Sequence, residues 1–168
     1  MSNQELVINL INPKIMANTY HQMYIQTVFA VKYREARITK EVKSQLMAVI
    51  GNLINETDCK TILVNGVEDH VHCFFGLKPP IDVSKVMQIA KAKSSKWVNE
   101  SGLLQRRFEW QEGFGAFSYS HSHIDAVFHY IENQERHHGK QTFLEEYIEM
   151  LQRYEVDFNK DYLFDELI

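Results

Sequence analysis

The sequence contains only two cysteines in 168 residues, Cys59 and Cys73. Both lie in apolar, strand-like runs, so we interpret them as small buried side chains in a reducing compartment rather than as a disulfide framework. No apolar run approaches the length of a membrane span. The first residues also lack the basic flank and long apolar core of a secretory signal. Together these absences predict a cytoplasmic protein without a membrane anchor.

The chain also lacks the net positive charge of many nucleic-acid-binding proteins, because 18 basic residues face 22 acidic ones and leave a net charge of -4. The charges are unevenly spread: the stretch 78–107 is mainly basic, whereas the residues after 141 are mainly acidic. A basic stretch can face phosphate groups, although a solvated helix face is the simpler explanation. The hydrophobic content of 45% fits a single globular domain of this length.

No internal repeat or low-complexity segment is visible, and two kinds of apolar pattern alternate along the chain. Runs rich in aromatic and β-branched residues predict strands at 20–31, 59–67, 70–77 and 108–119. Apolar residues at helical spacing predict helices at 39–53, 82–100, 124–136 and 143–154. This order predicts an α+β fold of the split βαβ, ferredoxin-like kind, with an antiparallel sheet, helices on one face and additional C-terminal helices. Residues 1–17 fit the pattern poorly and are predicted to be a loosely attached or disordered extension before a domain at 18–168.

Two histidines, His70 and His72, flank one apolar residue within the third predicted strand. Side chains alternate between the two faces of a strand, so both imidazoles point the same way. Two imidazoles side by side can share a metal ion, and a central strand would hold them rigidly. The pair alone equally fits two polar sheet residues.

Tyr130 and Gln134 are four residues apart in a predicted helix and therefore share one of its faces. A tyrosine oxygen can attack phosphorus, but near pH 7 the phenol is mostly protonated and needs a cation or base nearby. The Gln134 amide oxygen could supply a third, neutral metal ligand. Ordinary packing of Tyr130 and solvation of Gln134 are the alternative explanations.

These residues carry a resemblance to a known family. The chain resembles the IS200/IS605 transposases, the Y1 class of HUH single-strand DNA transposases. The resemblance rests on Asp69-His70-Val71-His72, on the glycine- and aromatic-rich segment 110–118, and on Tyr130-Ile131-Glu132-Asn133-Gln134 followed by two further histidines. It covers about residues 16–167.

The resemblance implies a ferredoxin-like homodimer that cuts and rejoins single-stranded DNA at insertion-sequence ends and recognises DNA hairpins. It implies that His70, His72 and Gln134 bind Mg²⁺ or Mn²⁺, and that Tyr130 is the nucleophile that forms a 5′-phosphotyrosine link. In such dimers the tyrosine helix can complete the partner's site, so that the active sites are shared between chains. We further expect the hairpin backbone to contact a set of lysines in the basic stretch, namely Lys85, Lys91, Lys93 and Lys96.

Three other interpretations remain open at this point. A relaxase or replication initiator would use the same chemistry but usually has a longer chain. A domesticated relative could bind single-stranded or hairpin DNA on the same fold without cleaving it. A two-histidine phosphoesterase would need a second histidine pair, for which His121 and His123 are the nearest candidates.

Overall fold

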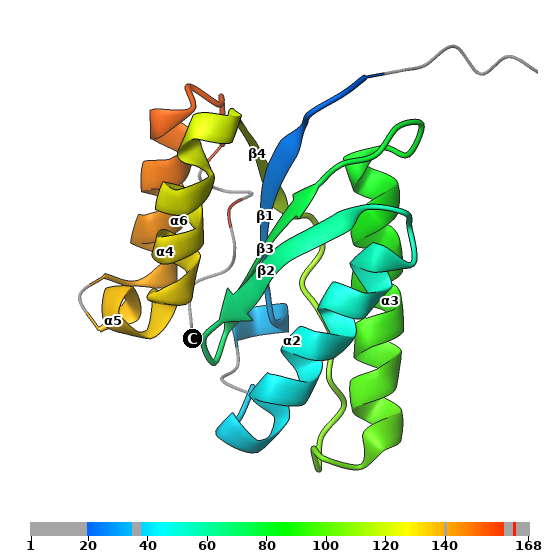
Figure 1. Cartoon of the computed structure of the whole chain (residues 1–168). Helices are drawn as coiled ribbons and strands as arrows, with labels where there is room; N and C mark the ends of the chain where they lie inside the picture. Colours follow the sequence, from blue (N-terminus) through cyan, green and yellow to red (C-terminus); the bar gives the residue numbers. More distant parts are fainter. Residues whose placement is uncertain (1–19, 35–37, 140, 160–162, 164–168) are drawn as a thin grey trace, which may run out of the picture.

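The centre of the computed structural model is a four-stranded antiparallel sheet in the order β2-β3-β1-β4 (Figure 1). The strands are β1 (Tyr24–Ala30), β2 (Lys60–Gly66), β3 (His70–Gly76) and β4 (Gly115–Tyr119). The structure describes residues 20–34, 38–139, 141–159 and 163. The predicted extension at 1–17 lies outside these residues, so the division of the chain at residue 17 stays a prediction.

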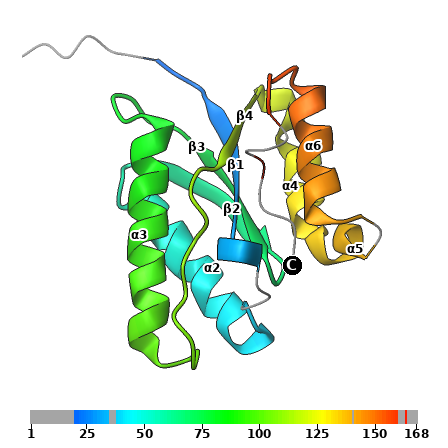
Figure 2. The same cartoon turned by 180° about the vertical axis from the view of Figure 1, so that it is seen from behind.

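Helices cover both faces of the sheet (Figures 1 and 2). On one face lie α2 (Lys40–Asn55) and α3 (Val83–Ser101). On the other lie α4 (Ile124–Glu132), α5 (Gln134–His138) and α6 (Phe143–Arg153). Two short 3-10 helices, η1 (Lys32–Arg34) and η2 (His121–His123), follow β1 and β4. The predicted ferredoxin-like fold is confirmed, with the C-terminal helices forming a third layer. No helix in the described part of the chain is long and apolar enough to cross a membrane.

The alternation of side chains along β3 separates two kinds of environment. Val71, Cys73 and Phe75 face the helices α2 and α3 and belong to the larger core. His70, His72 and Phe74 face the opposite layer, where Phe74 packs against Val127 and Ile131 of α4. Because β3 is covered on both faces, the two histidines are buried together with the apolar residues of the strand.

The fourth predicted strand and the third predicted helix differ from the expectation. Only 115–119 of the predicted strand 108–119 pairs with β1; the part before it is a loop, attached through a bridge between Val31 and Trp110. The predicted helix 124–136 is divided into α4 and α5 at Asn133, which ends α4 with non-helical backbone angles. The division matters for the site, because the second helix begins at the buried Gln134.

Candidate active site

His70 and His72 lie at the centre of the sheet, on the strand between β2 and β1. They pair in register with Ala30 and Val28 of β1, and their rings stand edge to face with centroids 5.1 Å apart. Both side chains are fully buried. An imidazole removed from water needs a partner for each ring nitrogen, which makes the surroundings of these rings informative.

Each histidine is held at Nδ1 by a neighbouring polar side chain. The carboxylate of Asp69 lies 2.8 Å from Nδ1 of His70. The amide of Gln26, which is buried on β1, lies 3.0 Å from Nδ1 of His72 and also accepts a hydrogen bond from the Tyr119 hydroxyl at 2.7 Å. Both contacts leave Nε2 facing inward, as in metal sites where a second group orients the histidine through its other nitrogen.

The tyrosine and the glutamine reach the histidines from two different helices. Tyr130 is on α4, with its ring centroid 6.0 Å from that of His72. Gln134 begins α5, is fully buried, and places Oε1 at 3.3 Å from His70 Nε2. The Asn65 side chain donates to the carbonyl oxygens of Ile131 (2.8 Å) and of the next residue, at the end of α4. These carbonyls would otherwise accept from the next helical turn, so Asn65 favours the break that turns Gln134 inward.

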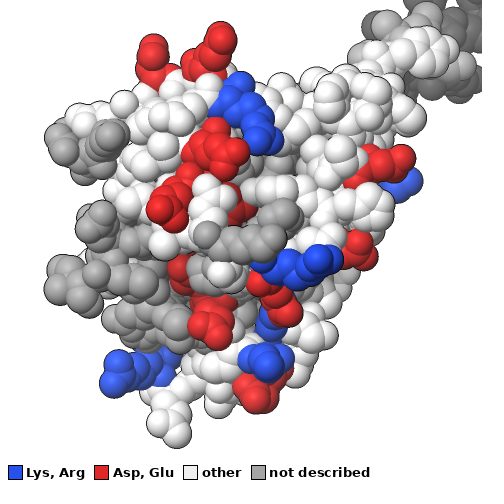
Figure 3. All heavy atoms as spheres, turned by 90° about the vertical axis from the view of Figure 1, so that its left-hand side faces the viewer, with Lys and Arg blue, Asp and Glu red and all other residues white. Residues whose placement is uncertain are grey.

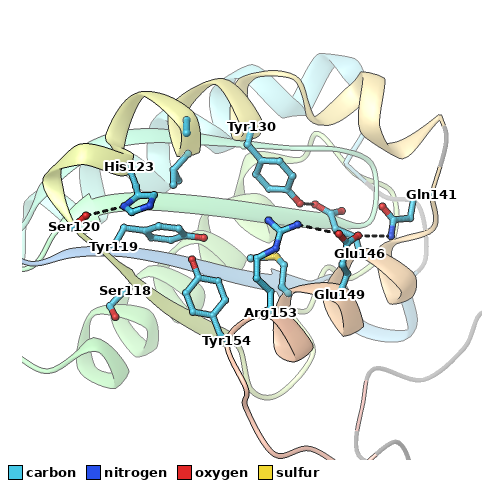
Figure 4. Close-up of a pocket in the computed structure, with 13 residues that line it drawn as sticks. Ser118, Tyr119, Ser120, His123, Tyr130, Gln141, Glu146, Glu149, Arg153 and Tyr154 are labelled. Carbon is cyan, nitrogen blue, oxygen red and sulfur yellow. Dashed lines mark hydrogen bonds and ion pairs between the residues drawn. The ribbon is translucent and has the colours of Figure 1, made fainter.

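Glu146 of α6 contacts both histidines as well as Tyr130 and Gln134. Its Oε1 accepts hydrogen bonds from the Tyr130 hydroxyl and from Gln134 Nε2 (3.0 Å), and Figure 4 shows the Tyr130 ring directed at this carboxylate. Glu146 Oε1 lies 3.5 Å from His72 Nε2, and Oε2 lies 3.5 Å from His70 Nε2. The side chain is only 6% exposed. One carboxylate therefore stands where the two imidazoles, the amide and the phenol converge.

The electrostatics of the cluster follow from burial and from the carboxylates. Burial opposes a charge on His70, but Asp69 and Glu146 outweigh it and raise its pKa. Burial and the neighbouring His70 lower the pKa of His72 to about 3. Burial would raise the pKa of Glu146, but hydrogen bonds from His70 and Tyr130 and the electrostatic influence of the two imidazoles lower it. Burial, with the charge of Glu146, raises the pKa of Tyr130, so the phenol is protonated as it stands.

The cluster can hold a divalent cation. Ligand atoms of His70, His72 and Glu146 lie within 4.8 Å of one another, and all three side chains are buried. Nε2 of His72 has no hydrogen-bond partner among the described residues, which leaves a buried lone pair or N–H for a ligand to satisfy. The Gln26 amide is compatible with metal binding. With its oxygen and nitrogen exchanged, the amide oxygen would accept a hydrogen bond from Nδ1–H of His72, and Nε2 of that ring would keep its lone pair for a metal. Imidazole nitrogens and carboxylate or amide oxygens suit a metal such as Mn²⁺.

The lysines expected to contact DNA all lie on α3, across the sheet from Tyr130 (Figure 1). Lys91 donates to the carbonyl oxygens of Gln111 (2.7 Å) and Gly113 (2.5 Å), and Lys93 pairs with Glu56 at 2.8 Å. Lys85 donates to Gln88, and Lys96 lies 3.7 Å from Glu100. Their role in DNA binding stays a prediction, and it concerns a surface away from Tyr130.

Sequence reasoning missed Gln26 and Glu146, although each leaves a signal. Glu146 lies between Phe143 and Met150 on the apolar stripe of α6, where a carboxylate is out of place. Gln26 shares a strand face with two apolar residues of β1. The competing pair His121 and His123 is exposed in η2, so neither resembles the buried pair on β3.

The fold and the site together define a small α+β protein whose central sheet carries a buried two-histidine centre beside a tyrosine. The family model described as IS200-like transposase matches residues 19–134, more than half of the chain. The chain belongs to this family of transposases, which are DNA-processing enzymes, as the sequence motifs predict. The match contains both histidines, Tyr130 and Gln134, but ends before α6 and Glu146.

Comparison with solved structures supports the fold. A candidate transposase of Deinococcus radiodurans superimposes with a TM-score of 0.58 and 18% identity, over 72% of this chain and 97% of that one. A REP-associated tyrosine transposase bound to a REP hairpin gives a TM-score of 0.50 and 14% identity, over 77% of this chain and 75% of that one. No curated protein matches the chain.

Proposed function

We propose that this protein cuts and rejoins single-stranded DNA at the ends of an insertion element through a covalent link between Tyr130 and a 5′-phosphate. One observation carries the proposal: the Tyr130 hydroxyl, the Gln134 amide and the imidazoles of His70 and His72 converge on a single buried point, although they come from three elements of the fold. If Tyr130 were an ordinary packed aromatic residue and Gln134 a solvated polar one, the four side chains would not be expected to be buried in contact with one another.

Tyr130 would supply the attacking electron pair, and the proton of its hydroxyl has an acceptor within the site. The Tyr130 oxygen attacks the phosphorus, the bond from phosphorus to the 3′-oxygen breaks, and that oxygen leaves to become a 3′-hydroxyl by taking a proton from solvent. Glu146 Oε1 already accepts the Tyr130 hydrogen bond, so it is placed to take the phenol proton. Because the phosphotyrosine keeps the energy of the broken bond, an incoming 3′-hydroxyl can reverse the step and join strands without a nucleotide cofactor.

A divalent cation, Mg²⁺ or Mn²⁺, completes this proposal. His70 and His72 would hold it through Nε2, with Gln134 Oε1 and the carboxylate of Glu146 as the oxygen ligands. When bound, such a cation would withdraw charge from the scissile phosphate and make the Tyr130 oxygen easier to deprotonate. Without it, the carboxylates of Asp69 and Glu146 favour the protonated form of His70, because they raise its pKa.

The proposed substrate is a single strand that carries a hairpin, bound by a homodimer. The REP-associated transposase of similar fold was solved with a REP hairpin, which supports a hairpin as the recognised DNA shape. Sharing of active sites between two chains stays a prediction. One chain by itself already brings His70, Gln134, Tyr130 and Glu146 together.

The test is the formation of a covalent adduct. Labelled hairpin-bearing single-stranded DNA is incubated with Mn²⁺ or Mg²⁺ and the wild type, Tyr130→Phe, or the matched control Tyr33→Phe, whose tyrosine is 58% exposed. We expect a denaturation-resistant protein–DNA band from the wild type and the control but not from Tyr130→Phe. An adduct with Tyr130→Phe would disprove the nucleophile. Hairpin binding without any adduct would instead favour a domesticated, non-cleaving protein.

A further inference from the structure

A cavity of about 920 Å³ opens beside Tyr130, between α4, α6 and the end of β4. Figure 4 shows Tyr130 and Glu146 at one end and the aromatic rings of Tyr119 and Tyr154 at the other. These two rings meet edge to face, with centroids 5.6 Å apart and an interplanar angle of 77°. The wall on the α6 side lies beyond the segment that matches the transposase family.

We propose that this cavity receives an unpaired base of the substrate strand, next to the scissile phosphate, stacked against Tyr119 and Tyr154. The inference rests on the proposed function, because it places the base at the side of the tyrosine that would attack. Cavities of about 300–1,000 Å³ hold ligands of the size of a nucleoside, so a base with its sugar fits the volume. The phosphate would then lie toward the Tyr130 end.

The charges around the cavity indicate that the base enters rather than the phosphate. Arg153 is the one basic side chain among the cavity's described lining residues, and it is paired with Glu149 at 3.0 Å. Glu149 itself adds negative charge to the lining. Figure 3 shows acidic side chains spread over the outside of this helical layer. A phosphate would be repelled deep in this cavity, whereas a neutral base stacked on an aromatic ring would not.

The aromatic end of the cavity is firmly held, which stacking requires. Tyr154 packs on Phe117 of β4 with ring centroids 4.9 Å apart. Tyr119 donates to Gln26, whose amide contacts His72 Nδ1, so the cavity wall is joined directly to the histidine pair. A base seated here would place the adjoining phosphate near the site. The Ser120 hydroxyl and His123, hydrogen-bonded at 2.8 Å, also line the cavity and offer polar atoms to a base edge.

The experiment combines a change in the protein with a change in the DNA. Single-turnover adduct formation is measured with an intact strand and with strands carrying an abasic site on either side of the cleaved bond. We expect Tyr154→Leu to react about fivefold or more slowly than wild type on the intact strand, since stacking of a base on one aromatic ring is worth at least that much. On the strand whose abasic site removes the seated base, the wild type and Tyr154→Leu should react at the same rate.

Two controls separate stacking from folding. Tyr154→Phe keeps the ring and should recover most of the rate that Tyr154→Leu loses, and Tyr33→Leu, outside the cavity lining, should react like the wild type. The inference is overturned if the wild type cleaves both abasic strands as fast as the intact one, or if Tyr154→Leu slows all strands alike. In either case the adduct still forms, so the proposed function survives. Absence of any adduct from the wild type would overturn both.

Discussion

Asp69, Gln26 and Glu146 surround the histidine pair, and each acts on a different nitrogen or pair of nitrogens. Asp69 and Gln26 hold the two Nδ1 atoms, whereas Glu146 faces both Nε2 atoms. Groups that orient a ligating histidine through its other nitrogen also set its affinity for the metal. Gln26 is the most informative of the three to change, because it carries no charge.

Replacing Gln26 by leucine keeps the side-chain volume and removes the contact with His72. We expect Gln26→Leu to bind Mn²⁺ about 10- to 100-fold more weakly than the wild type, as measured by calorimetric titration, because the His72 ring loses the group that fixes it. Gln22→Leu, on the exposed segment before β1, is the control. Unchanged affinity in Gln26→Leu would show that Gln26 does not orient the ligand.

Lys91 yields a prediction about pH. Burial lowers the pKa of Lys91 to about 8, from the 10.5 that is usual for a lysine side chain in water. Between these values the unfolded chain binds more protons than the folded one, so the stability of the wild type should rise with pH from about 8 to 10.5 relative to Lys91→Met. Because the ammonium is partly exposed, we expect a change on the order of 1 kcal/mol. Urea unfolding of both proteins at several pH values measures it; a constant or falling difference would contradict the assignment.

The histidine pair was predictable from sequence because alternation along a strand is local, whereas the role of Glu146 was not. A glutamate in an acidic C-terminal stretch looks like a solvated residue, and the apolar stripe on which it lies is the only local sign against that. Its contact with Tyr130 depends on how α6 packs on the sheet, which no local pattern encodes.

Among the elements, α6 is the one that completes the site, and its position depends on β4. Thr142 and Glu145 form a capping box that starts α6, and Phe143 stacks on His70 with ring centroids 4.2 Å apart. At Gly115 the helix approaches the strand so closely that a Cβ atom there would lie 2.6 Å from Cε2 of Tyr147 and 3.0 Å from Cγ1 of Val28. The absence of a side chain at Gly115 therefore lets α6 dock.

Adding one methyl group at Gly115 should displace α6. We expect Gly115→Ala to lower the free energy of unfolding by about 1–3 kcal/mol and to slow adduct formation, because Tyr147 must move and Glu146 moves with it. Gly76→Ala is the matched control, since its Cβ would meet only ordinary contacts at 3.9 Å or more. Urea unfolding and the adduct assay provide the two measurements. If Gly115→Ala matches Gly76→Ala in both, the close approach has no consequence for α6.

The helix boundaries show what local patterns miss. The spacing of apolar residues predicts one helix across 124–136, whereas the chain breaks at Asn133. The cause lies on β2: Asn65, distant in sequence, takes up the carbonyl groups at the end of α4. The existence of the four strands and most helix ends follow local rules and were predictable. The break between α4 and α5 was not predictable, because it depends on the tertiary contact with Asn65.

At the scale of the whole molecule, the sheet separates the reacting groups from the basic helix. Tyr130 and Glu146 lie in one helical layer, and the lysines of α3 lie in the other. If those lysines hold a hairpin, the single strand must pass around the edge of the sheet to reach the tyrosine. The His72 and Tyr130 rings of one chain already lie close together, so a single chain holds all four residues of the proposed site.

Mixing two inactive variants tests this arrangement. His70→Ala lacks a proposed metal ligand and Tyr130→Phe lacks the proposed nucleophile, so neither should form an adduct alone. Because the four site residues come together within one chain, we expect an equimolar mixture, unfolded and refolded together, to stay inactive. Recovery of about a quarter or more of the wild-type adduct would show instead that the chains share their sites. Native mass spectrometry of the mixture establishes whether mixed dimers form.

The position of β3 has a consequence for how the protein opens. Amide groups of a strand hydrogen-bonded on both sides exchange with solvent mainly when the whole domain unfolds, whereas short outer helices exchange through local opening. His70 and His72 therefore belong to the part of the molecule that opens last, and α5, with Gln134, belongs to a part that can open separately. The strand with the two histidines can stay fixed while α5, with Gln134, loosens and closes again, as successive cutting and joining of strands would require.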